Sequence, residues 1–112
     1  MVIRRGEVYW VDFRGSIGAE IRKVRPGVII SEDGHNENMS TVTVAPLSSA
    51  AGRILLCEAV VPEGLLGDGR PARVKTHQLR AVDKQRLRNK LGVLPIGAMA
   101  AVDESLRIHL GL

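Results

Sequence analysis

The sequence is poor in the residues on which metal, disulfide and cofactor chemistry depends. It contains one cysteine, Cys57, and its three histidines, His35, His77 and His109, lie far apart in the chain. One cysteine excludes an intrachain disulfide and suits a reducing compartment, and the histidines form none of the closely spaced patterns that indicate a zinc site. Glycine-rich loops of the kind that bind nucleotide cofactors are absent as well. If the chain is an enzyme, we expect it to work without a cofactor or a metal ion.

Aromatic residues and long apolar runs are also scarce. The three aromatic residues, Tyr9, Trp10 and Phe13, fall in one short segment, which offers no ladder of stacking platforms for nucleic-acid bases. We therefore interpret them as core residues. No apolar run is long enough to cross a bilayer, and the N-terminal Met-Val-Ile-Arg-Arg-Gly has no apolar signal-peptide core. These absences predict a cytoplasmic protein without a membrane segment.

What the sequence does contain is positive charge. Sixteen lysine and arginine residues, most of them arginine, stand against twelve acids, and the formal net charge is +4 over 112 residues. Because the planar fork of arginine matches phosphate in a bidentate way, this composition favours a polyanionic partner, although a solvated basic surface fits it equally well. The acids are scattered and do not form the set of carboxylates that a two-metal nuclease needs. The length fits a single domain over residues 1–112.

The stretch 18–31 joins a charged segment directly to an apolar strand. The β-branched run 28–30 is typical of a strand inside a core, and Lys23 and Arg25 stand at its entrance. Pro26 lacks a backbone N–H and favours extended geometry in the residue before it, so Arg25 is fixed at the start of the strand. An arginine held in this way favours the binding of an anion.

Short β-branched segments separated by turn residues predict a mainly β core. The third segment alternates cleanly and stops at Pro46, and the fourth stops at Pro62. The segment 32–38, between the second and third strands, is dense in turn formers and is interpreted as a turn. Strands are predicted at 7–13, 25–31, 41–45 and 55–61, with shorter extended pieces at 73–75 and 79–82.

The last third of the chain changes to a helical period. Asp83 is a good N-cap and Gly92 a good C-terminal cap, so a short helix is predicted over 83–92. Apolar residues step by three and four between 96 and 110 and predict a second helix there. The expected fold class is therefore mainly β with C-terminal helices (α+β), arranged as a small, strongly bent barrel with the helices outside.

The residue types that remain for chemistry suit a phosphate group. Arg25 is a candidate anion clamp, Ser48 and Ser49 form a hydroxyl pair after the third strand, and Glu20 lies in the loop before the clamp. Taken alone, a Pro-Leu-Ser-Ser segment is also an ordinary strand terminus. The residue types indicate phosphate chemistry and leave the local interpretation of the serines open.

Four motifs span essentially the whole chain. They are Arg-Gly-Glu-Val-Tyr-Trp-Val-Asp-Phe at 5–13, Gly-x-Glu-x-x-x-x-Arg-Pro at 18–26, Val-Ala-Pro-Leu-Ser-Ser at 44–49 and Gly-Arg-Pro-Ala-Arg-Val-Lys-Thr-His-Gln-Leu-Arg-Ala-Val-Asp-Lys at 69–84. In content and order they resemble the MazF/PemK family of toxin endoribonucleases. The resemblance implies an SH3-like barrel that forms a homodimer and cleaves single-stranded RNA sequence-specifically, without metal or cofactor. It also implies a partner, an acidic and partly disordered MazE-like antitoxin that competes for the basic groove.

The resemblance further implies roles for single residues. The catalytic pair of the family corresponds to Arg25, which would bind the phosphate and stabilise transition-state charge, and to Ser48, which would fix the in-line geometry. Many members carry threonine at the second position, and serine keeps the hydroxyl but loses the stiff β-branched rotamer. Glu20 corresponds to the family glutamate and is the candidate base, although a solvated loop carboxylate paired with Arg22 fits its position nearly as well. The loops 14–24 and 46–54 would read unstacked bases. Residues expected to contact RNA are Lys23, Ser49, Arg73, Lys75, Gln78 and Arg80.

Three alternatives stay open at this level. A toxin of the same superfold that poisons DNA gyrase would need no Arg25–Ser48 pair, and a non-enzymatic RNA-binding barrel would bind RNA and leave it intact. A general acid–base ribonuclease that uses His77 and His109 is the third alternative. Cleavage of RNA in excess chelator distinguishes a metal-independent ribonuclease from the first two.

Overall fold

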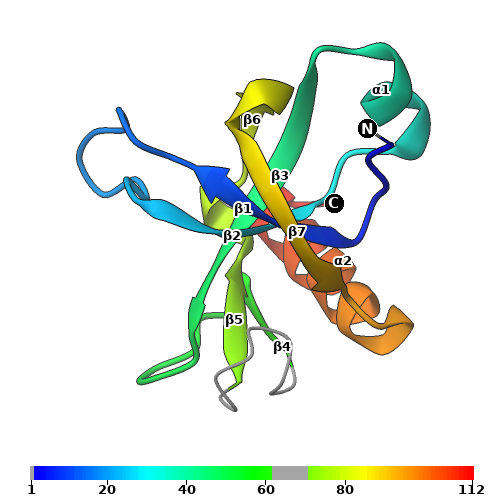
Figure 1. Ribbon diagram of the computed structural model, residues 1–112. Coiled ribbons are helices and arrows are strands. Elements are labelled where there is room, and N and C mark those ends of the chain that lie inside the picture. The colour runs from blue at the N-terminus through cyan, green and yellow to red at the C-terminus, as the bar shows by residue number, and fades with distance from the viewer. Residues whose placement is uncertain (1, 62–70) are drawn as a thin grey trace.

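A strongly bent antiparallel sheet forms the frame of the molecule, and one long helix lies against it (Figure 1). The computed structural model describes residues 2–61 and 71–112. Within these ranges the strand order is β4-β5-β3-β2-β1-β7, and β6 pairs with β3 beside that path. The elements are β1 (Glu7–Asp12), β2 (Val24–Ile29), α1 (Asp33–Asn38), β3 (Thr41–Ser49), β4 (Glu58–Val61), β5 (Ala72–Lys75), β6 (Arg80–Asp83), β7 (Leu87–Val93) and α2 (Ile96–Leu110), with 3-10 turns η1 (Thr76–Gln78) and η2 (Lys84–Arg86).

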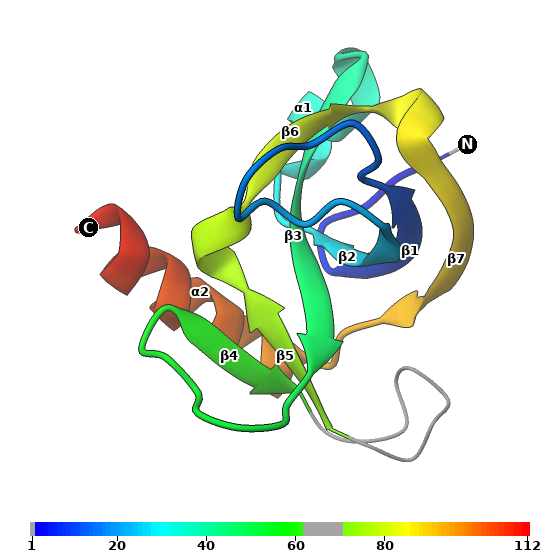
Figure 2. The same cartoon turned by 90° about the vertical axis from the view of Figure 1, so that its left-hand side faces the viewer.

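The nine-residue strand β3 joins the two halves of the sheet (Figure 2). It pairs with β6 through 41–44, with β2 through 44–46 and with β5 through 47–49. The prediction that this strand ends at Pro46 is wrong, because Pro46 stands opposite Gly27 at the end of the β2 ladder and the next residue begins the β5 ladder. A proline, which cannot donate to a ladder, fits where the strand changes partner. Ser48 and Ser49 therefore lie in the strand itself and not in a turn after it.

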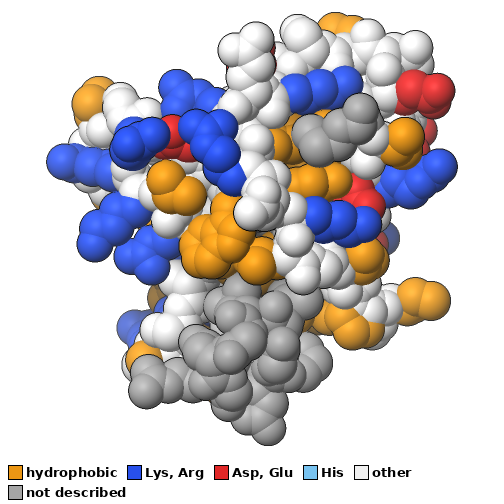
Figure 3. Space-filling view, viewed as in Figure 1, with side chains coloured by type: hydrophobic (Ala, Val, Ile, Leu, Met, Phe, Trp, Pro, Cys, Tyr) orange, Lys and Arg blue, Asp and Glu red, His pale blue; other side chains and the backbone are white. Residues whose placement is uncertain are grey.

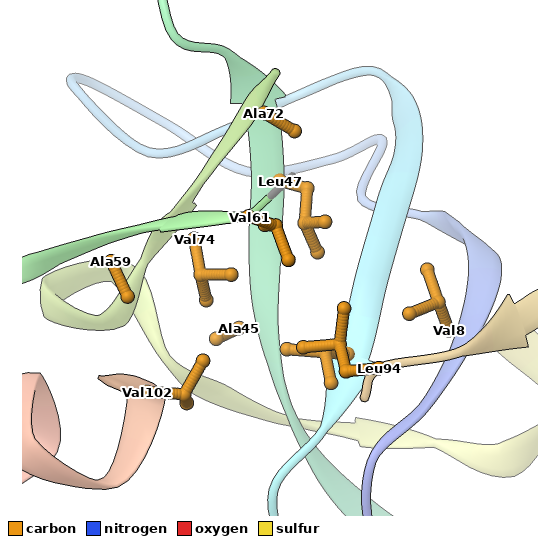
Figure 4. Packing of buried hydrophobic residues seen from close by; sticks show 10 residues of the cluster. Val8, Ala45, Leu47, Ala59, Val61, Ala72, Val74, Leu94 and Val102 are labelled. Atoms are coloured by element: carbon orange, nitrogen blue, oxygen red, sulfur yellow. The ribbon is translucent and has the colours of Figure 1, made fainter. Parts of the chain in front are cut away.

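Apolar side chains fill both faces of the bent sheet. One cluster lies between the sheet and α2 and includes Val8, Leu47 and Val102 (Figure 4). The other includes Val11 and Phe13. Successive residues of a strand point to opposite faces, so β1 supplies Val8 to the first cluster and Val11 to the second. This two-sided core makes the sheet a rigid support for the residues where β2 begins and β3 ends.

The backbone of β2 approaches the second core so closely at Gly27 that a side chain does not fit. A Cβ atom there would lie 2.9 Å from Val11 Cγ2 and 3.6 Å from Phe13 Cζ. We expect Gly27→Ala to lower the free energy of unfolding by about 1–3 kcal/mol, as overpacking of a filled core does. Urea denaturation measures the change. Gly97→Ala in α2 is the matched control, because a Cβ at Gly97 meets no atom within 4 Å, and equal losses in both variants would contradict the packing argument.

The C-terminal helix agrees with the sequence prediction. α2 spans Ile96–Leu110 and is followed by Gly111 at φ 72°, a left-handed conformation that glycine adopts without a Cβ penalty. Arg5 Nη2 lies 2.5 Å from Asp103 Oδ1 and ties the helix to the N-terminal segment. Neither helix of the described ranges has the length and apolar character needed to cross a membrane. The expected class, mainly β with C-terminal helical structure, is confirmed.

The helix predicted over 83–92 is wrong. This segment contains the end of β6, the turn η2 and most of β7. Asp83 does cap a turn, since its Oδ1 accepts from the backbone N–H of Gln85 at 2.8 Å, but that turn is three residues long. Leu87 is buried in the second core and pairs with Val11 of β1. Pairing with a distant strand therefore overrides a weak local helical pattern.

The turn predicted over 32–38 is a short helix instead. The carboxylate of Glu32 caps α1 and accepts from the backbone N–H groups of Gly34 at 2.8 Å and His35 at 3.1 Å. Turn formers and helix caps use the same polar residues, so a single turn of helix is hard to distinguish from a loop by composition. The fourth predicted strand begins at Glu58 and not at 55, and its predicted stop at Pro62 lies outside the described residues.

Candidate active site

Arg25 and Ser48 come together where β2 begins and β3 is about to end. The β2–β3 ladder ends at the pair Gly27–Pro46, so Arg25 stands two residues before that end on β2 and Ser48 two residues beyond it on β3. Both line a pocket of about 480 Å³. Its other lining residues are Trp10, Lys23, Val24, Pro26, Leu47 and Ser49. The predicted catalytic pair and two of the predicted RNA contacts therefore share one cavity.

The pocket is suited to an anion. Its described lining contains two cations, two hydroxyls and no carboxylate. Arg25 is held by the β1–β2 ladder, in which it pairs with Val11, and its guanidinium makes no hydrogen bond or ion pair with any described residue. Its five N–H donors therefore have no acceptor among the described residues and are available to a ligand. Lys23 is exposed and Ser48 half-buried, so a ligand can reach both.

Trp10 is a pocket residue that the sequence analysis placed in the core. Its neighbours Tyr9 and Val11 are buried, whereas Trp10 is 37% exposed and pairs across the sheet with Pro26. The alternation of β1 could have revealed this, because residues 9 and 11 share one face and residue 10 points to the other. An exposed indole beside an anion site can stack on a nucleic-acid base.

Glu20 does not line the Arg25 pocket. It lies in the β1–β2 loop, where its carboxylate is 3.7 Å from Arg80 Nη1. With Gln78 and Arg80 it lines a second pocket of about 700 Å³, which reaches Pro46 on β3. The candidate base and the candidate catalytic pair therefore line different pockets. The two pockets lie next to each other on β3, because Pro46 lines the Glu20 pocket and Leu47 lines the Arg25 pocket.

Gln78 and Arg80 hold the β1–β2 loop in place. Gln78 Oε1 accepts from the backbone N–H of Ile21 at 2.9 Å, and its Nε2 donates to the carbonyl of Ala19 at 3.2 Å. Arg80 donates to Ser16 Oγ and lies over the Phe13 ring at 5.9 Å from its centroid. Both side chains therefore position the loop, whatever further contacts they make with a ligand.

Arg73 is buried and forms an ion pair and several hydrogen bonds within the protein. It lies 3.1 Å from Glu58 Oε1, with side-chain exposures of 9% and 1%. It also donates to the carbonyls of Ser49 at 3.0 Å, Arg53 at 2.7 Å and Ala51. This placement argues against the predicted contact of Arg73 with RNA and assigns it to holding the segment after β3. Lys75, at the other end of β5, is half-buried opposite Glu58 and lines neither pocket.

Basic side chains extend beyond the pocket. Lysine and arginine gather on the side of the molecule where the β1–β2 loop projects (left in Figure 3). Within the part of the chain that the structure describes, no three His, Cys, Asp or Glu side chains are grouped as a metal site. The fold and the site together define a small bent β-protein with a basic pocket whose described lining suits a phosphate-like anion.

Comparison with known proteins places the chain in a family. The model for PemK-like, MazF-like toxins of type II toxin-antitoxin systems matches residues 4–110. The chain belongs to this family and is a toxin endoribonuclease of the MazF/PemK kind, as the sequence predicted. It is 34% identical over 113 residues to endoribonuclease EndoA of Bacillus subtilis, covering 100% of this chain and 97% of EndoA. It is 35% identical over 112 residues to endoribonuclease MazF of Staphylococcus epidermidis, covering 99% and 93%.

Solved structures agree in fold. MazF of Deinococcus radiodurans superimposes with a TM-score of 0.85 at 24% identity, over 100% of this chain and 99% of that one. A mycobacterial endoribonuclease solved in complex with its cognate antitoxin gives 0.80 at 21% identity, over 98% and 96%. At these identities the likeness supports the fold alone, which is the toxin fold that the sequence predicted.

Proposed function

We propose that this toxin cleaves single-stranded RNA at the Arg25 pocket, sequence-specifically and without a metal ion. The observation that carries the proposal is the guanidinium of Arg25, free of partners among the described residues, beside Ser48 in a cavity whose described lining has no carboxylate. A phosphodiester supplies the negative charge that this cavity lacks. RNA also brings its own nucleophile, the 2′-hydroxyl, so the protein needs only to position it and to neutralise charge.

In the proposed reaction the 2′-oxygen attacks the adjacent phosphorus and the bond from phosphorus to the 5′-oxygen breaks. The 2′-hydroxyl gives its proton to a base, and the departing 5′-oxygen takes up a proton from a water molecule. The first products are then a 2′,3′-cyclic phosphate and a 5′-hydroxyl. Arg25 stabilises the extra charge on the phosphorane, and Ser48 holds the phosphate or the 2′-hydroxyl in line.

We propose Glu20 as the base that accepts this proton. It is the carboxylate of the β1–β2 loop that borders the neighbouring pocket, and its ion pair with Arg80 is long, at 3.7 Å, and more than half exposed on the glutamate side. Such a pair is weak, so bound RNA can displace it. The role requires the loop to bring Glu20 toward the Arg25 pocket, because the two sites do not share lining residues.

The two pockets divide the remaining RNA contacts between them. Lys23, Ser49 and Trp10 surround the scissile phosphate in the first pocket. The second combines apolar side chains with the polar groups of Glu20, His77, Gln78 and Arg80, a combination that suits an unstacked base. We propose that the loops 14–24 and 46–54, which border these pockets, set the choice of sequence.

We propose that the antitoxin is acidic and partly disordered and inhibits by occupying the same basic surface. A flexible acidic peptide can order itself in a groove shaped for a polyanion. We further propose that the toxin is a homodimer and acts in the cytoplasm, where its RNA substrate is found.

Incubation of the purified protein with a long single-stranded RNA in excess chelator tests the proposed function. We expect discrete cuts, and no cut where the nucleotide before the scissile bond carries a 2′-deoxyribose, because its nucleophile is missing. Cleavage that disappears with chelator contradicts a metal-independent mechanism. Binding without any cut favours the RNA-binding barrel, and a protein that neither binds nor cuts RNA favours the gyrase poison.

A further inference from the structure

Three arginines gather around Asp12 outside both pockets, two of them on its carboxylate and one on its backbone carbonyl. Arg14 makes a bidentate contact with Asp12, through Nε to Oδ1 at 2.9 Å and Nη2 to Oδ2 at 2.7 Å. Arg88 Nη2 reaches the same Oδ2 at 3.1 Å. Arg86 Nη1 donates to the carbonyl of Asp12 at 2.9 Å and to that of Arg14 at 3.0 Å. We call these four residues the Asp12 arginine cluster.

The cluster continues the face that carries the Arg25 pocket. Trp10 and Asp12 are two apart on β1 and so point to the same face, and Trp10 lines the pocket. Asp12 pairs with Val24, which also lines it. On the other side of β1, β7 pairs Lys90 with Tyr9 and Leu87 with Val11, and the irregular register between these pairs leaves both Asn89 and Arg88 across from Trp10. A positive track therefore runs from the pocket across β1 to the edge strand β7.

The cluster holds more positive charge than its carboxylate neutralises. Three guanidiniums and one carboxylate leave a net charge of +2, and hydrogen bonds from Arg14 hold the pKa of the Asp12 carboxyl well below its usual range, so it stays ionised. The side chains of Arg14 and Arg88 are 70% and 47% exposed. Each arginine has N–H donors beyond those used within the cluster. Asp12 thus fixes the guanidiniums in place while their outer edges face solvent.

We propose that the Asp12 arginine cluster binds backbone phosphates of the RNA substrate outside the cleavage pocket. The inference rests on the proposed function and extends it, because it adds a second binding region to the same substrate. Arginine forks pre-organised by a carboxylate match phosphate in a bidentate way. Contacts of this kind read no bases, so they raise affinity for long RNA without changing the cleavage sequence.

Two RNA fragments around one mapped cut site test the inference. The short fragment holds only the immediate neighbours of the cut, and the long fragment extends well beyond them on both sides. We expect Arg88→Gln to raise the KM for the long fragment several-fold, with kcat unchanged and the short fragment unaffected. On a long fragment with a 2′-deoxyribose at the cut, the slope of log Kd against log salt should fall by about 0.7 for each phosphate that the variant no longer neutralises.

Arg4→Gln is the matched control, since it removes an exposed charge near α1 whose ion pair with Asp33 is long, at 3.9 Å. In Arg88→Gln the bidentate pair of Arg14 with Asp12 remains, so the variant is expected to fold, which thermal melting checks. Equal losses on both fragments, or a salt slope like that of the wild type, would overturn the inference. Weaker antitoxin binding with RNA binding unchanged would also overturn it and make an acidic peptide the occupant. If the wild type cuts no RNA at all, so that no cut site can be mapped, but the salt slope for binding a long single-stranded RNA still depends on Arg88, the proposed function fails and the phosphate contacts of the cluster stand.

Discussion

Replacing Arg25 with alanine is expected to lower RNA cleavage by at least about 10²-fold, the usual effect of losing one donor to a developing oxyanion. The guanidinium has no structural partner among the described residues, so its removal leaves no buried group unpaired, and Pro26 and the β1–β2 ladder still hold the strand. The fold should therefore remain intact. The rate constant for a single mapped cut, measured with enzyme in excess, reports the chemical step.

Two further variants test whether the effect of Arg25 depends on its charge, on the shape of its guanidinium or on its position in the chain. Arg25→Lys keeps the positive charge but loses the planar fork, so an intermediate rate is expected. Arg22→Ala removes an exposed guanidinium of the neighbouring β1–β2 loop, whose Nη2 donates to the carbonyl of Gly18 at 2.8 Å, and is expected to change the cleavage step far less. Near-normal turnover in Arg25→Ala would remove this residue from the mechanism. A loss in Arg22→Ala as large as that in Arg25→Ala would point to general loss of charge and not to a specific site.

The placement of Arg25 could be predicted because the signal is local. Pro26 restricts the residue before it, and the β-branched run that follows determines a strand. The alternation of β1 likewise contained the information that Trp10 faces away from Tyr9 and Val11, although the scarcity of aromatics suggested a core role. Where adjacent residues determine the backbone conformation, the sequence alone is sufficient to predict where a side chain lies.

The remaining errors come from contacts between distant segments. Strand β7 was mistaken for a helix because its partner, β1, lies about eighty residues earlier in the chain. The sequence around Asp83 and Leu87 does not indicate that the edge of β1 is available for pairing. The Asp12 arginine cluster was missed for the same reason, since Arg88 and Asp12 are separated by 76 residues. Local propensity is a weak prior, and tertiary pairing overrides it.

Charge alone could not separate the arginines that face a ligand from those that serve the fold. Arg25 and Arg73 look alike in the sequence, and both stand in strands that flank Ser48. The difference lies in Glu58, which is buried and reaches Arg73. A buried carboxylate determines where a guanidinium must go, because an unpaired charge in the interior costs several kcal/mol. An arginine buried together with its acid serves the fold, so the number of arginines alone does not identify the site.

Replacing Arg73 with methionine is expected to lower the free energy of unfolding by about 3–5 kcal/mol, because it leaves the carboxylate of Glu58 buried without its cation. The variant also frees the carbonyls of Ser49 and Arg53 from their donor. Lys75→Met, two residues along the same strand, is the matched control and should cost much less, since Lys75 is half-buried and makes no ion pair with a described residue. Urea denaturation gives both values.

A double variant decides whether the loss belongs to the ion pair. In Glu58→Leu/Arg73→Met the buried charge is gone from both sides, and we expect the free energy of unfolding to recover much of what Arg73→Met loses, because apolar side chains of similar size often replace a buried pair without penalty. Recovery keeps the test usable even if Arg73→Met alone does not fold. A variant Arg73→Met that is as stable as the wild type but binds RNA more weakly would contradict this assignment and return Arg73 to the substrate-binding surface. A stable double variant that still cuts RNA would show that Arg73 serves the active site only by holding the segment beside Ser48.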